Sequence, residues 1–185
     1  STNGTAIVAQ AANQTITNAG LVSGSAFGVI ATGAGTTISN LSGGTIQGTS
    51  GVYSAGLTTV TNANNAAITA TTGNAVRLVT AGSSLINAGT ISGSSTFAGV
   101  FFDNMGTVTN QAGGTISNTA TAVQFGGTTG SSVLDNAGSI SNTNTNSAVY
   151  LNGTGTVTNR ATGTIASTNG FGVQFAGANA VVTNL

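Results

Sequence analysis

The stretch Gly106–Phe125, GTVTNQAGGTISNTATAVQF, contains the pattern from which the fold can be predicted. It has an apolar residue two positions before Asn110, a second at Ile116 and a third at Val123. Each of these residues lies in a short segment where apolar and small or polar residues alternate, which is the period of a β-strand. Gly, Asn, Ser and Thr separate the segments and favour turns. The stretch therefore predicts three short strands joined by turns.

The same pattern recurs along the whole chain of 185 residues. An [Ile/Val/Leu]-x-Asn tripeptide returns every 22 to 26 residues, and its asparagines are Asn18, Asn40, Asn62, Asn87, Asn110, Asn136, Asn159 and Asn184. Repeats of this length with three strands each predict a parallel β-solenoid, whose successive coils stack about 4.8 Å apart. We therefore expect an all-β parallel β-helix of about eight coils. A β-sandwich rarely repeats one register so often, and a propeller blade is nearly twice as long.

Stacked coils turn equivalent positions into ladders. The apolar residues of the three segments are expected to form the internal ladders and the core. The repeated Asn has the same parity as the apolar residue before it, so it is expected to point inward or to cap a turn. There its amide could bond to the Asn residues above and below, and Asn also tolerates the left-handed backbone of a corner.

The composition excludes several functions. Only Arg77, Asp103, Asp135 and Arg160 are charged, the formal net charge is zero, and His and Cys are absent. General acid–base catalysis needs a His or two neighbouring carboxylates, and a zinc site needs three or four His, Cys or acidic ligands. Nucleic-acid binding needs many cations, and a membrane-spanning helix needs about 18 or more consecutive apolar residues. We therefore expect no enzyme, no cofactor or metal, no nucleic-acid partner and no direct membrane insertion of this segment.

One outward ladder gathers aromatic and charged residues. Tyr53, Arg77 and Phe101 are expected on consecutive coils, with Arg77 between the two rings and Asp103 diagonally nearby. Tyr150 occupies the same ladder further along the chain. Tyr and Arg are enriched at interfaces, so these five residues are a candidate contact patch for a protein or glycan. The alternative is ordinary stacking of side chains along a sheet.

A second outward ladder is rich in threonine. It comprises Thr15, Thr17, Thr37, Thr59, Thr61, Thr107, Thr109, Thr156 and Thr158. A flat array of Thr-x-Thr motifs resembles the ice-binding face of antifreeze β-helices, although Ile86, Val133 and Asp135 interrupt it here. The alternative is that Thr is a good residue for an exposed strand.

Two further expectations concern single residues. Asp135 and Arg160 fall one coil apart and are expected to form a surface ion pair. Phe27, Phe97 and Phe171 precede the third strand of their repeats and are expected to pack at its turn.

The repeats also resemble a known family. Gly106–Asn118 and Thr121–Phe125 are similar to the passenger domains of Gram-negative autotransporters, including pertactin-like and filamentous-haemagglutinin-like adhesins. The resemblance covers essentially the whole chain and implies a right-handed, roughly triangular β-helix displayed on, or shed from, the cell surface. The chain lacks the family's translocator barrel, a Gly-Asp-Ser-Gly protease motif and an Arg-Gly-Asp motif.

These observations lead to one functional hypothesis and two alternatives. Residues 1–185 are expected to be a single β-helix segment, a fragment of a longer rod, because the sequence starts and ends within a repeat. The hypothesis is a non-enzymatic, structural and adhesive segment of a secreted protein on the outer surface of a Gram-negative bacterium. Its partner would be a protein or glycan of another cell. The alternatives are a self-assembling extracellular fibre and an ice-binding solenoid that uses the threonine ladder.

Overall fold

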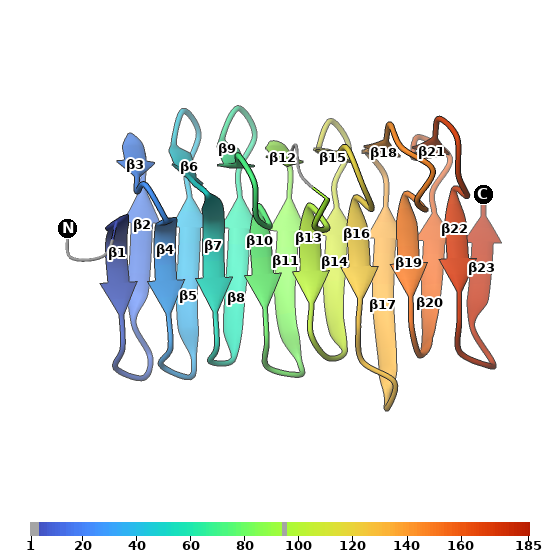
Figure 1. Cartoon of the computed structure of the whole chain (residues 1–185), viewed down its shortest axis with the longest axis horizontal. Helices are drawn as coiled ribbons and strands as arrows, with labels where there is room; N and C mark the ends of the chain where they lie inside the picture. The colour runs from blue at the N-terminus through green and yellow to red at the C-terminus, as the bar shows by residue number, and fades with distance from the viewer. Residues whose placement is uncertain (1–3, 94–95) are drawn as a thin grey trace.

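The computed structural model of this chain describes residues 4–93 and 96–185. These two ranges contain 23 β-strands and no α-helix. The strands form three parallel sheets, and each coil of the chain contributes one strand to each sheet in turn. We name the sheets A, B and C in the order in which each coil passes through them. Figure 1 shows the coils side by side as a rod, with sheet A in front, sheet B behind it and sheet C along the upper edge.

The bounds of the strands follow the repeat. Sheet A consists of β1 (Thr5–Ala9), β4 (Phe27–Ala31), β7 (Ser50–Ser54), β10 (Val76–Leu78), β13 (Val100–Phe102), β16 (Val123–Phe125), β19 (Val149–Leu151) and β22 (Val173–Phe175). Sheet B consists of β2 (Thr15–Asn18), β5 (Thr36–Asn40), β8 (Thr58–Asn62), β11 (Ser83–Asn87), β14 (Gly106–Asn110), β17 (Ser131–Asn136), β20 (Thr154–Asn159) and β23 (Val181–Asn184). Sheet C consists of β3 (Leu21–Ser23), β6 (Thr45–Gly48), β9 (Ala67–Ala70), β12 (Thr90–Gly93), β15 (Thr115–Asn118), β18 (Ser139–Asn142) and β21 (Thr164–Ser167).

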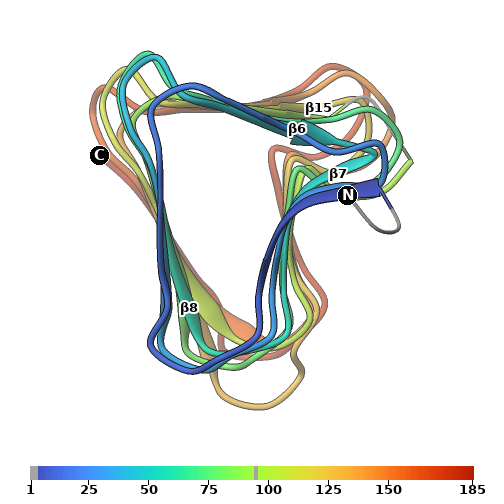
Figure 2. The same ribbon diagram turned by 90° about the vertical axis from the view of Figure 1, so that its left-hand side faces the viewer.

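The register of the strands confirms the stacked repeat. Val100 pairs with Val123, and Asn87 pairs with Asn110, so residues one repeat apart are neighbours on adjacent coils. Seen from the N-terminal end, the chain passes clockwise through sheets A, B and C while it recedes from the viewer (Figure 2). The solenoid is therefore right-handed, with a roughly triangular coil. The predicted fold class is confirmed.

The core lies between the three sheets and consists of the predicted apolar ladders. Ile38, Leu85 and Ile116 are fully buried, like the other internal Val, Ile and Leu residues of the middle coils. Phe102 and Phe125 are also fully buried, and their rings stack on adjacent coils with centroids 5.1 Å apart. The core is thus a column of side chains that each coil extends.

The Asn ladder runs inside the rod beside sheet B. The Nδ2 of each ladder Asn donates to the Oδ1 of the next at 2.8–2.9 Å, from Asn18 through to Asn184. The same Nδ2 also bonds to main-chain carbonyls, as Asn110 does with Gly114 and Ser139. The predicted inward position of these Asn residues, on the same side as the apolar residue two positions earlier, is confirmed. The left-handed backbone is found elsewhere, at Asn13, Asn65 and Asn179 among the described non-glycine residues, because the ladder residues end strands and need extended backbone.

Strands of sheet A depart from simple alternation at one point. A small residue and the Val after it are both buried, as in Gly28-Val29 and Gly51-Val52. A Cβ on Gly51 would lie 2.5 Å from the Ala75 carbonyl oxygen and 2.8 Å from Ile68 Cγ2, so the chain packs tightly at this corner. Because two successive residues face inward, Phe27 and Ser50, which precede these two pairs, lie partly exposed on the outer side. On later coils the corresponding residues, such as Asn74 and Ser147, are buried.

Candidate functional site

An arginine lies between two aromatic rings on the outer side of sheet A. Arg77 on β10 pairs in register with Tyr53 on β7 and with Phe101 on β13. Its guanidinium carbon lies 5.8 Å from the Tyr53 ring centroid and 5.6 Å from that of Phe101. Both distances are within the range of cation–π contacts. The predicted arrangement of these three residues is confirmed.

Asp103 completes this cluster. Arg77 Nε donates to Asp103 Oδ1 at 2.9 Å, and Nη2 donates to Oδ2 at 2.7 Å. This bidentate bond raises the pKa of Arg77, because it stabilises the charged guanidinium. The side chains remain 42% and 23% exposed, so the pair adds only about 0–1 kcal/mol to stability. Its main effect is local, since it holds the guanidinium in place and leaves the cluster without net charge.

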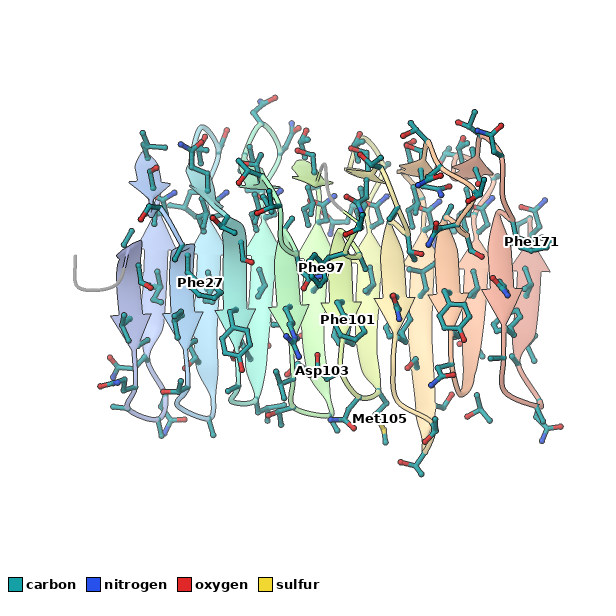
Figure 3. The ribbon with its side chains drawn as sticks, viewed as in Figure 1. Phe27, Phe97, Phe101, Asp103, Met105 and Phe171 are labelled. Carbon is teal, nitrogen blue, oxygen red and sulfur yellow. The ribbon has the colours of Figure 1, made fainter. Side chains whose placement is uncertain are left out.

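A groove adjoins this cluster at the corner between sheets C and A, and Tyr53 and Arg77 belong to both. It has a volume of about 380 Å³. Phe27, Tyr53 and Phe97 supply aromatic lining, and Ser50, Asn74 and Arg77 supply polar lining together with Thr49 and Thr72. The Phe27 and Tyr53 rings lie 5.9 Å apart and are tilted by 57°. Figure 3 shows Phe27, Phe97, Phe101 and Asp103 along the same face of the rod.

Two of the groove's aromatic residues were not predicted as site residues. Phe27 begins β4 instead of lying in the turn before it, and its ring packs against Tyr53. Phe97 and Phe171 were expected to pack at their turns, and both are largely exposed there, at 59% and 63%. The Gly28-Val29 pair carried a signal for the outward position of Phe27, because two inward residues in succession place the residue before them on the outer side.

Tyr150 belongs to the predicted ladder but not to the cluster. It lies on β19 and pairs with Gln124 on one side and Gln174 on the other. Its hydroxyl donates to Asn152 Oδ1 at 3.4 Å. The whole of β16 separates it from Phe101, so the structure does not bring it together with the other four patch residues.

The threonine ladder lies along sheet B in the predicted register. Thr15 pairs with Thr37 and Thr37 with Thr59, which gives one unbroken row over β2, β5 and β8, while Ser39 lies between Thr17 and Thr61 in the second row. Ile86 on β11 then separates Thr61 from Thr109, and Asp135 on β17 separates Thr109 from Thr158. The array is therefore regular over three coils and broken in the rest of the rod.

The predicted ion pair on this sheet is confirmed. Arg160 Nε donates to Asp135 Oδ1 at 2.6 Å, and Nη2 donates to Oδ2. These bonds lower the pKa of Asp135, because they stabilise its charged form. The pair projects a charged group into the middle of the threonine array, where a flat face would be needed for ice.

The Asp135 pair predicts a pH effect on stability. A lowered pKa means that its stabilising contribution is present above the ordinary value of 3.8 and is lost as the pH falls through the folded-state pKa. We expect denaturant unfolding between pH 2 and pH 7 to show a smaller acid-side loss in Asp135→Asn than in the unchanged chain. Arg160→Gln should reduce the slope in the same way. If Arg160→Gln loses as much stability as the unchanged chain when the pH falls from 7 to 2, the pair does not lower the pKa of Asp135.

The described residues contain no group of three or more His, Cys, Asp and Glu side chains that could hold a metal ion. Within residues 4–93 and 96–185, no helix has the length and apolar character to cross a membrane. The charged side chains instead form two separate ion pairs, one beside the groove and one on sheet B.

Comparison with known proteins adds no family to this description. No family model matches the chain, and no curated protein and no solved structure matches it.

Proposed function

We propose that this chain is a non-enzymatic, adhesive rod segment of a secreted bacterial surface protein. The observation that carries this proposal is the groove and the neutral Arg77 cluster beside it. Together they gather exposed and partly exposed aromatic residues on one face of a rod whose other outward residues are mostly Thr, Ser, Asn and Gly. Such clusters favour contact with a partner, because aromatic rings and arginine supply most of the binding energy at interfaces.

The rod itself suits the presentation of such a site. Each internal strand is hydrogen-bonded to a coil on either side, and the Asn ladder links the coils a second time. These links resist bending, so a groove on one coil would be held at a fixed place along a stiff stalk. The resemblance of the repeats to autotransporter passenger domains supports a location outside the outer membrane.

The alternative of ice binding has less support. The threonine array is regular over only β2, β5 and β8, and the Asp135–Arg160 pair stands further along the same sheet. Thermal hysteresis measured at micromolar protein would support this alternative, and filaments that grow with protein concentration would support the fibre alternative.

The adhesive proposal is tested by binding of the labelled chain to intact cells of several hosts, measured by flow cytometry. We expect saturable binding that falls at least about tenfold in the double variant Tyr53→Ala and Phe97→Ala, because both rings line the groove. The matched control is Tyr150→Ala with Phe171→Ala, which removes one Tyr and one exposed Phe outside the groove. Equal loss in both double variants would contradict the assignment of the groove, and absence of saturable binding would contradict the adhesive function.

A further inference from the structure

We propose that the groove binds an uncharged saccharide of one or two pyranose rings. This inference rests on the proposed adhesive function and specifies its ligand. The groove volume of about 380 Å³ is near the lower end of the roughly 300–1,000 Å³ typical of small-molecule sites. It is large enough for the end of an oligosaccharide and too small for a folded protein surface.

The aromatic lining suits the apolar face of a sugar ring. Phe97 is 59% exposed, and the tilted rings of Phe27 and Tyr53 form the neighbouring wall. The face of an aromatic ring carries negative potential, and the C–H groups on one side of a pyranose are weakly positive, so the two attract each other. Exposed apolar patches of this kind commonly mark binding sites.

The polar lining suits the sugar hydroxyls. Ser50, Thr49 and Thr72 carry hydroxyl groups, which both donate and accept hydrogen bonds as sugar hydroxyls do. The Thr49 hydroxyl donates to the Ser25 carbonyl at 2.8 Å and so keeps lone pairs that can accept. Asn74 is 8% exposed, and its Nδ2 donates to the Ala98 carbonyl at 2.5 Å, which holds the amide in one orientation. An apolar peptide side chain could not use the hydrogen-bonding capacity that remains on these groups, whereas sugar hydroxyls can.

The charge balance favours a neutral ligand. Asp103 compensates Arg77, so neither an anionic nor a cationic ligand meets an unpaired opposite charge. Two of the five guanidinium N–H groups are used in this ion pair, which leaves three to donate to hydroxyl oxygens. The rings of Tyr53 and Phe101 hold the guanidinium between them, so these donors occupy a fixed position.

The inference is tested by applying the whole chain to an array of neutral and sialylated oligosaccharides, followed by calorimetry with the neutral glycan that binds best. We expect binding to neutral glycans, reduced about tenfold or more in Phe97→Ala and unchanged in the equally exposed Phe171→Ala. Asp103→Asn leaves the charge of Arg77 uncompensated and should shift the preference toward sialylated glycans. A sialylated preference in the unchanged chain, equal binding by Phe97→Ala, or binding to no glycan would each overturn the inference.

Cell-binding experiments distinguish a failure of the saccharide inference from a failure of the proposed adhesive function. Adhesion lost after enzymatic removal of cell-surface glycans supports the saccharide. Adhesion that survives this treatment but is lost after protease treatment overturns the saccharide and leaves the adhesive function standing. Array binding without any adhesion to cells would support the site and contradict the adhesive function.

Discussion

Replacing Asn110 with aspartate is expected to lower the free energy of unfolding by about 3–5 kcal/mol at neutral pH, because it places an uncompensated charge in the rod. Asn110 is fully buried, and its Nδ2 donates to Asn136 Oδ1, Gly114 O and Ser139 O. A carboxylate has no N–H group, so the introduced charge would face three acceptor oxygens. The measurement is denaturant unfolding followed by circular dichroism.

The effect of this substitution should depend strongly on pH. Burial and the surrounding oxygens should raise the pKa of the introduced carboxyl above its usual value of about 3.9. The loss of stability is then greatest above that raised pKa and diminishes as the pH falls toward 4. The control is Asn64→Asp in the exposed turn after β8, which we expect to change stability by less than about 0.5 kcal/mol. Equal losses for Asn110→Asp at pH 4 and pH 8 would contradict a buried charge.

Replacing Phe102 with alanine should lower the free energy of unfolding by a similar amount, about 3–5 kcal/mol, because it leaves a cavity in the core. The Phe102 ring is fully buried, stacks on Phe125 and fills the space beside Gly106. Because neighbouring coils hold the backbone in register on both sides, the core has little freedom to collapse into the gap. The measurement is again denaturant unfolding, at pH 7.

The matched control for this cavity is Phe171→Ala, since Phe171 is 63% exposed and its loss should change stability by less than about 0.5 kcal/mol. Phe102→Leu should recover most of the loss, because it keeps most of the buried volume. Similar losses at positions 102 and 171 would indicate that the core is not the main source of stability.

The ladders could be predicted because their determinants are local in the sequence. Alternation sets which side chains of a strand face inward, and the interval between successive [Ile/Val/Leu]-x-Asn tripeptides sets which residues stack. Arg77 between Tyr53 and Phe101 and the pairing of Asp135 with Arg160 follow from the same two rules. These contacts join residues at fixed offsets, so counting along the chain was sufficient to find them.

The groove could not be predicted in this way. It joins Phe27 on one coil to Asn74 and Phe97 on later coils, through turns of different sequence between sheets C and A. Gly, Ser, Thr and Asn are compatible with several types of turn, so contacts with neighbouring coils select among them. The position of Phe27 also depended on the corner at Gly28, where a Cβ would come within 2.7 Å of Ile46 Cγ2.

The three-sheet solenoid, its register, its core and its Asn ladder follow from the amino-acid sequence alone, because a repeated interval and a period of two are properties of the chain. That Phe27 and Phe97 join Tyr53 around a groove is visible only in the folded structure. A ladder depends on position within a coil, whereas a groove depends on how irregular turns pack against one another.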